Sequence, residues 1–142
     1  MSATLEKIPF TRKLGFAIDR AAVGDVRMTL PDDPLTKNMA GTVHAGALYT
    51  FGETVAGVAA GIETLDIAFP FARRAQVHYR RPVRGAVIGR ARVEAAEIER
   101  VKAELHNHGR AELRVCVELE DADGQTVAEM DVDYAFRPLE KC

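Results

Sequence analysis

The sequence predicts an α+β fold in which a curved antiparallel sheet wraps around one long central helix. Residues 38–62 carry a single formal charge and are apolar on nearly all sides of a helix, so this helix should be enclosed. Several other segments alternate apolar with charged residues, which indicates strands of a sheet with one buried face. The 142 residues suffice for one domain, spanning 1–142, and are too few for two ordinary ones.

Two short strands are expected within residues 14–30, before the helix. Apolar side chains there occupy every second position in two runs: Leu14, Phe16, Ile18, and then Val26, Met28, Leu30. Gly24-Asp25 between the runs suits a turn or a bulge. The segment Pro31-Asp32-Asp33-Pro34 then interrupts regular structure.

The central helix is expected from about residue 44 to residue 62, with two distinct faces. The large residues gather on one side: Leu48, Phe51, Val55, Val58 and Ile62. The small ones gather on the other: Gly46, Thr50, Glu53, Ala56, Gly57 and Ala60. The large side should pack on the sheet. The small side would admit another helix or an extended ligand, unless its residues only relieve crowding in the core.

The second half of the chain predicts antiparallel strands with one inserted helix. Strand-like runs cover 75–81, 86–95, 110–120 and 126–136. Residues 96–108 change to helical periodicity, and Gly109 fits a C-terminal cap. Asp123-Gly124 between the last two strands is a hairpin signal.

Glu53 is the outstanding candidate for chemistry. It is the only formal charge between Asn38 and Ile62. A buried carboxylate is costly unless it is paired or used, so such a residue marks a possible functional site. Asn38, His44 and Thr50 are polar groups that could share the site.

His44 and Glu53 are nine residues apart, which places them on opposite sides of one straight helix. They can converge only if two helices meet about a two-fold axis, with His44 of one chain beside Glu53 of the other. A symmetric dimer would then hold two equivalent sites. The free N–H groups of Ala45 and Gly46 in the first turn could stabilise developing negative charge, as an oxyanion hole does.

The motif around these residues resembles the hotdog-fold thioesterases, especially the PaaI-like acyl-CoA thioesterases. The matching segment runs from Asn38 through Gly41 to His44-Ala45-Gly46, with an acidic residue, Glu53, nine positions after the histidine. The order of elements and the length match over nearly the whole chain. The helix at 96–108 resembles an insertion in a less characterised branch of hotdog proteins.

The resemblance implies hydrolysis of an acyl-CoA thioester, without a cofactor, by a homodimer or a dimer of dimers. Glu53 would be the general base or the nucleophile. The Ala45 or Gly46 N–H would polarise the thioester carbonyl with help from Asn38, and His44 would orient the loop or the carbonyl.

Two features depart from the family pattern. Ala45 replaces the first glycine of a His-Gly-Gly motif. The strand after the helix reads Phe71-Ala72-Arg73-Arg74 and has no Ser or Thr to hold water. Gln76 and Thr50 are candidate replacements. A non-catalytic acyl-CoA-binding module is therefore an alternative, and a hotdog hydratase or dehydratase is a lower-ranked one.

Seven arginines lie between Asp66 and Glu94, a stretch that contains no acidic residue. Arginine suits bidentate contacts with phosphate. Arg80, Arg81 and Arg84 around Pro82 could therefore receive the phosphates of coenzyme A or an acidic acyl-carrier protein. The other explanation is ordinary solvated strand ends that pair with neighbouring carboxylates.

Composition and charge argue against several other classes of protein. A net charge of −2 gives no general attraction to nucleic acid. The two cysteines and the lack of a zinc ligand pattern argue against a disulfide framework and a metal site. The N-terminus has no apolar region typical of a signal peptide, and Glu53 in the centre of 43–62 disfavours a membrane span. The expected location is cytoplasmic.

Overall fold

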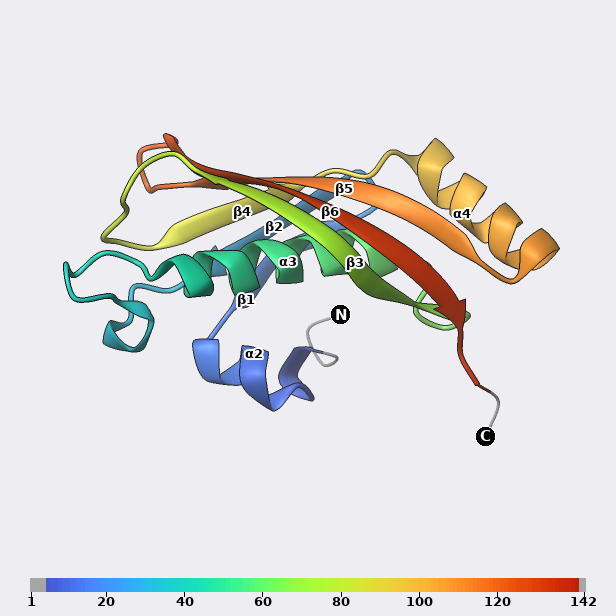
Figure 1. Cartoon of the computed structure of the whole chain (residues 1–142), viewed down its shortest axis with the longest axis horizontal. Helices are drawn as coiled ribbons and strands as arrows, with labels where there is room; N and C mark the ends of the chain where they lie inside the picture. The colour runs from blue at the N-terminus through green and yellow to red at the C-terminus, as the bar shows by residue number, and fades with distance from the viewer. Residues whose placement is uncertain (1–4, 141–142) are drawn as a thin grey trace.

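The computed structural model describes residues 5–140 and shows one curved sheet packed on one long helix. Six antiparallel strands follow the order β1-β2-β4-β5-β6-β3. In Figure 1 the helix α3 lies along one face of the sheet, and the short helix α2 lies beyond α3. The predicted α+β architecture of the single chain is therefore confirmed.

The N-terminal third contains a helix that the sequence did not predict. Helix α2 covers Pro9–Leu14, begins with proline and ends at Gly15, which has a left-handed φ of 73°. Leu14 thus belongs to α2 rather than to the first strand. Strands β1 (Ala17–Ala22) and β2 (Asp25–Leu30) follow, joined by the predicted turn at Gly24, where φ is 78°.

Helix α3 spans Ala45–Gly61, one residue inside each predicted end. A short 3-10 helix, η1 (Pro34–Thr36), precedes it. The large residues Leu48, Phe51, Val55 and Val58 are buried against the sheet, as expected. Ala56 and Ala60 are buried as well, so the accessible part of the small face is narrower than predicted and contains Thr50, Glu53 and Gly57.

Glycine lets the sheet approach α3 closely at β4 (Val87–Ala91). A Cβ atom on Gly89 would lie 2.7 Å from Cγ2 of Val55 and 3.0 Å from the Phe51 ring. The strand therefore packs against the helix at a distance that a side chain at this position would prevent.

Strand β3 covers Ala68–Tyr79 and forms one edge of the sheet. It starts at Ala68, seven residues before the predicted run. Pro70 lies in this first part and has no N–H to donate, which an edge strand tolerates. Its pairing with β6 (Thr126–Pro138) shifts register between Ala72 and Arg74, which indicates a bulge.

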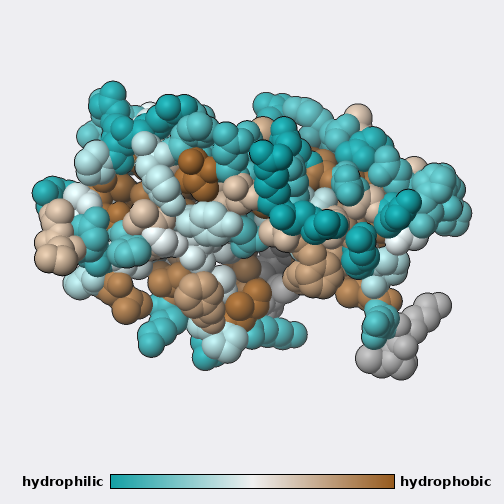
Figure 2. All heavy atoms as spheres, in the orientation of Figure 1, coloured by the Kyte–Doolittle hydropathy of each residue, from teal (hydrophilic) through white to brown (hydrophobic). Residues whose placement is uncertain are grey.

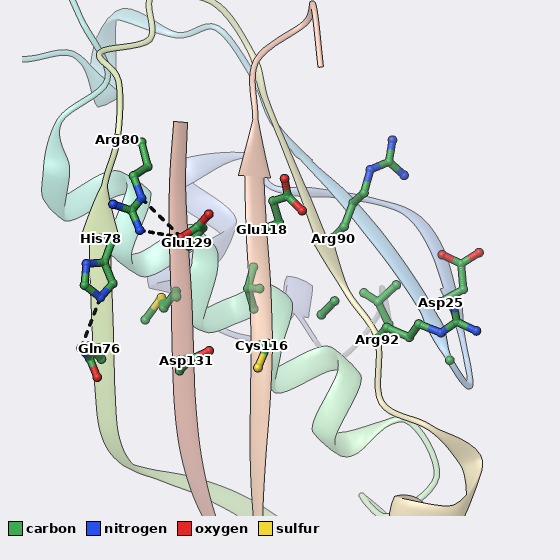
Figure 3. A pocket seen from close by; sticks show the side chains of 15 residues that line it. Asp25, Gln76, His78, Arg80, Arg90, Arg92, Cys116, Glu118, Glu129 and Asp131 are labelled. Carbon is green, nitrogen blue, oxygen red and sulfur yellow. Dashed lines mark hydrogen bonds and ion pairs between the residues drawn. The ribbon is translucent and has the colours of Figure 1, made fainter. Parts of the chain in front are cut away.

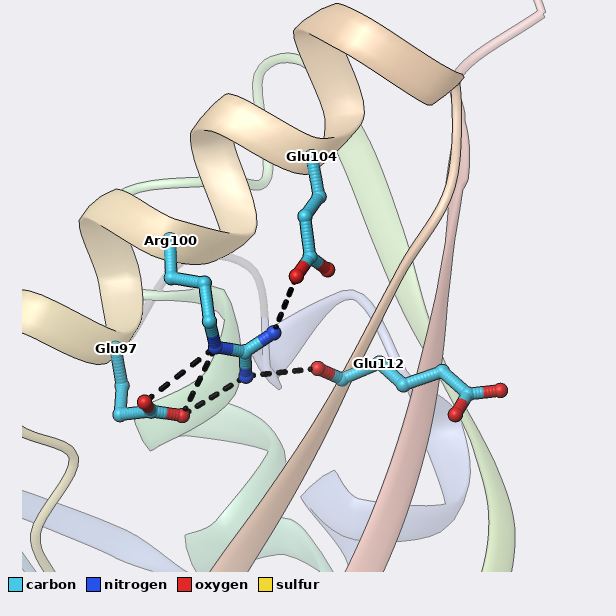
Figure 4. Close-up of polar contacts among 4 residues, drawn as sticks. All are labelled: Glu97, Arg100, Glu104 and Glu112. Carbon is cyan, nitrogen blue, oxygen red and sulfur yellow. Dashed lines mark hydrogen bonds and ion pairs between the residues drawn. The ribbon is translucent and has the colours of Figure 1, made fainter.

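The inserted helix α4 spans Ala95–His108, starting one residue before the predicted start, and leads into β5 (Ala111–Glu120) at one end of the sheet. Ile98 and Val101 are its buried contacts. Arg100 lies between Glu97 and Glu104 of the same helix and also donates to the Glu112 carbonyl at 3.0 Å (Figure 4). These contacts hold α4 against the start of β5. No helix among residues 5–140 is long and apolar enough to cross a membrane.

Candidate active site

Glu53 lies half-buried on the accessible face of α3 and has one side-chain partner among the described residues, Tyr134. The hydroxyl of Tyr134 lies 3.0 Å from Oε1 of Glu53 and 3.0 Å from its backbone oxygen. Tyr134 comes from β6, where its register partner on β3 is Ala72, and it is buried. The sheet thus supplies the polar contact that the sequence could not assign.

Burial raises the pKa of the Glu53 carboxyl, and the hydrogen bond from Tyr134 opposes that shift. Burial and the nearby Glu53 carboxylate raise the pKa of Tyr134. The tyrosine therefore stays protonated and acts as a donor. A carboxylate whose pKa is raised towards neutrality is a better proton acceptor than an exposed one.

A cavity of about 450 Å³ extends along α3 beside Glu53 and Thr50. Its other walls come from the α2 region and from the start of β3, and they are largely apolar. Gly57 leaves the space next to Tyr134 open, since a Cβ there would lie 3.4 Å from the tyrosine oxygen. A carboxylate facing an apolar cavity of this size is typical of a small-molecule site.

The predicted loop residues lie at the other end of α3. His44 is the N-cap, and its Nδ1 accepts from the Gly46 N–H at 2.8 Å. That leaves Nε2 as the ring nitrogen that carries hydrogen in the neutral imidazole. The Gly46 N–H is therefore engaged. The Ala45 N–H has no acceptor among residues 5–140.

Asn38 shapes this loop. Its Oδ1 accepts from the N–H groups of Ala40 and Thr42, and its Nδ2 donates to the Thr42 hydroxyl at 2.8 Å. A second hollow, of about 250 Å³, brings Asn38 together with Ala45, Arg80 and Arg81. The predicted residues thus divide between two places in one chain, one holding Glu53 and Thr50 and one holding the loop.

The three arginines around Pro82 have protein partners. Arg80 contacts Glu129 at 3.0 Å, and Arg81 contacts Gln125 at 3.0 Å. Arg84 donates to the Ala40 carbonyl at 3.1 Å. Among the described residues Arg81 and Arg84 form no ion pair with a carboxylate, and these contacts are to neutral groups.

A further hollow, of about 890 Å³, lies on the face of the sheet away from α3. Its side chains are mostly charged and polar and project from the strands, among them His78, Glu129 and Asp131 (Figure 3). Glu53 does not contribute to it. Within residues 5–140 no group of three or more His, Cys, Asp or Glu side chains is arranged to hold a metal ion.

Sequence comparison matches residues 1–135 to a family described as "Domain of unknown function (DUF4442)". No curated protein matches the chain.

Solved structures resemble it over nearly the whole length. A Pseudomonas aeruginosa protein of unknown function, described as a "probable thioesterase", is 29% identical with a TM-score of 0.86, covering 96% of this chain and 91% of that one. A Haemophilus influenzae thioesterase is 18% identical with a TM-score of 0.77, covering 97% and 89%. A Chlorobaculum tepidum protein of unknown function is 15% identical with a TM-score of 0.85, covering 96% and 93%. The chain thus has a thioesterase-like hotdog architecture.

Proposed function

The chain belongs to the DUF4442 family, whose description assigns no activity, and from its site we propose that it hydrolyses acyl-CoA thioesters. The observation that carries the proposal is Glu53, a half-buried carboxylate on the wall of an apolar cavity whose one side-chain partner is the Tyr134 hydroxyl. The thioesterase-like hotdog architecture supports it.

Glu53 takes the proton of a water molecule as the water oxygen attacks the thioester carbonyl carbon. The tetrahedral intermediate then collapses, the carbon–sulfur bond breaks, and the CoA thiolate takes up a proton. Direct attack by the carboxylate uses the same residue: the carbon–sulfur bond breaks, the CoA thiolate leaves and takes up a proton, and water then opens the resulting anhydride. Tyr134 holds the carboxylate in place in both routes.

The Ala45 N–H is the oxyanion donor in this proposal. It is the first N–H of α3, it belongs to an exposed residue, and it has no acceptor among the described residues. Loss of one such donor costs roughly 2.7–4 kcal/mol of transition-state stabilisation. His44, with a hydrogen on Nε2, orients the carbonyl from the same loop.

The complete site requires a second copy of the chain. Ala45 and Glu53 are eight residues apart, or about 12 Å along the helix axis. One carbonyl cannot contact both in a single chain. In a two-fold dimer, Glu53 of one protomer faces Asn38, His44 and Ala45 of its partner.

The edge strand β3 supports this dimer. It offers twelve residues, Ala68–Tyr79, with one side unpaired, and an unpaired edge is open to a further strand. The Phe69 and Phe71 rings lie 4.9 Å apart on this strand and are 43% and 53% exposed. A second copy that pairs with β3 would cover them.

Arg81 and Arg84 would bind the phosphates of coenzyme A. Arg80 could also contribute, although it forms an ion pair with Glu129. They lie beside the loop of Asn38 and Ala45, so the CoA end of the substrate would enter at the helix start. An acidic carrier protein would use the same charges.

The test is release of free thiol from acyl-CoA by the purified protein and by Glu53→Gln. We expect kcat/KM of the variant to fall 10²- to 10⁴-fold. The matched control is Glu63→Gln, because Glu63 is exposed and pairs with Lys102. Tight binding of acyl-CoA without turnover would favour the binding-module alternative, and hydration of crotonyl-CoA would favour the hydratase alternative.

A further inference from the structure

The N-terminal part of the chain forms part of the wall of the cavity beside Glu53. Ile8 and Phe10 from the α2 region line it together with Val58, Leu65 and Phe69. Ile8 and Phe10 are 42% and 63% exposed, although both are large and apolar. Figure 2 shows hydrophobic side chains on the side of the molecule where α2 lies.

Four of the five hydroxyl groups on the cavity wall have acceptors among the described residues, and only that of Tyr49, at one end of the cavity, has none. Thr50 donates to the Gly46 carbonyl at 2.9 Å and Thr54 to the Thr50 carbonyl at 2.7 Å. Thr11 donates to the Ile8 carbonyl at 3.2 Å, and Tyr134 donates to Glu53. A ligand with hydroxyl or carboxylate groups would find few free donors here, and burying those groups unpaired is costly.

The length of the cavity also limits the ligand. Tyr49 and Val58 mark its ends along α3 and are nine residues apart, or about 13.5 Å along the axis. Glu53 lies between them, five residues or about 7.5 Å along the axis from Val58. A carbon–carbon bond of about 1.5 Å advances an extended alkyl chain by roughly 1.25 Å, so about six carbons beyond a carbonyl at Glu53 cover this distance. The volume of about 450 Å³ lies in the range of small-molecule pockets.

We infer that the space between α2 and α3 takes the unbranched, unsubstituted alkyl chain of a medium-length acyl group, of about six to eight carbons. The inference rests on the proposed function for the identity of the thioester and adds the class of acyl group. Glu53 lies in the wall of this space, so the carbonyl of the bound chain lies beside it.

The first test is a series of straight-chain acyl-CoA esters from acetyl to palmitoyl. We expect KM to fall roughly fourfold for each methylene buried, up to about eight carbons, and then to level off. Phenylacetyl-CoA and 3-hydroxydecanoyl-CoA should be poorer substrates than decanoyl-CoA. An optimum at acetyl, or a preference for the aryl or hydroxylated ester, would overturn the inference.

The second test is Ile8→Asn, which makes the cavity wall polar. Ile8 is the N-cap of α2 and makes no side-chain capping bond, so asparagine suits the backbone there. We expect the selectivity for decanoyl-CoA over acetyl-CoA to fall roughly tenfold. The matched control, Val23→Asn, changes a 38% exposed residue in the turn between β1 and β2 and should leave selectivity unchanged. Unchanged selectivity in Ile8→Asn would count against the cavity as the acyl site.

Calorimetric titration separates this inference from the proposed function. Decanoyl-CoA that binds the wild type at least tenfold more tightly than free CoA, without being hydrolysed, would refute hydrolysis and keep the acyl site. Hydrolysis of short esters with no gain in affinity from the decanoyl chain would refute the acyl site and keep hydrolysis.

Discussion

At the scale of single residues, the contact between Glu53 and Tyr134 sets the proton affinity of the candidate base. Burial raises the pKa of Glu53, and the tyrosine hydrogen bond stabilises the ionised form and limits that rise. The base works only when ionised, so activity should be lost as the pH falls through this raised pKa. The acid limb should therefore lie above the ordinary glutamate value of 4.5.

Tyr134→Phe removes the hydroxyl and keeps the ring in the core. Without the hydrogen bond the pKa of Glu53 rises further, so we expect the acid limb of kcat/KM to move to higher pH. The measurement is a pH–rate profile of wild type and variant on one acyl-CoA ester. If the hydroxyl only supports the fold, activity would drop equally at every pH and the limb would stay in place.

The contact with Tyr134 could not be predicted from the sequence. The residue lies 81 positions after Glu53 and belongs to an alternating strand, where it reads as one more core side chain. Only the sheet register, which sets Tyr134 opposite Ala72, brings it over the helix. Glu53 could be predicted as a candidate site residue, because a single charge within a long apolar stretch can be recognised from the neighbouring sequence alone.

At the scale of elements, prediction succeeded where periodicity is strong and failed where it is short or interrupted. Helices α3 and α4 appear within a residue or two of their predicted ends. The six-residue helix α2 was missed, and its last residue, Leu14, was assigned to the first strand because it continues the alternation of Phe16 and Ile18. The predicted run at 75–81 did not include the first part of β3, where Pro70 lies, and the edge position makes the missing N–H of this proline harmless.

The close packing of α3 on β4 makes a prediction about stability. Gly89→Ala adds a Cβ that would lie 2.7 Å from the Val55 side chain and 3.0 Å from the Phe51 ring. Both side chains are buried in the core. We expect a loss of about 1–3 kcal/mol in the free energy of unfolding, the usual range for overpacking. The measurement is chemical denaturation monitored by circular dichroism.

Gly85→Ala is the control for that experiment, since a Cβ there meets nothing within 4 Å and the backbone has an ordinary φ. It should be close to neutral, or slightly stabilising through the unfolded state. Equal stability of the two variants would contradict the view that glycine is required for the contact between α3 and β4.

At the scale of the whole molecule, the proposed site is divided between two protomers, and this can be tested by mixing two inactive variants. Glu53→Gln removes the base. Ala45→Pro removes the oxyanion N–H, and proline suits the first position of a helix, particularly after His44, whose backbone is extended. Each variant alone should be nearly inactive.

Co-expression of the two variants should restore about a quarter of wild-type activity per chain, because half of the randomly paired dimers are mixed and each mixed dimer has one intact site. The intact site takes Glu53 from the proline variant and the Ala45 N–H from the glutamine variant. Differently tagged copies allow mixed dimers to be purified, and these should then have half the wild-type activity per dimer. Mixed dimers no more active than the separate variants would show that Glu53 and Ala45 do not act together across an interface, whereas recovered activity requires that both chains contribute to one site.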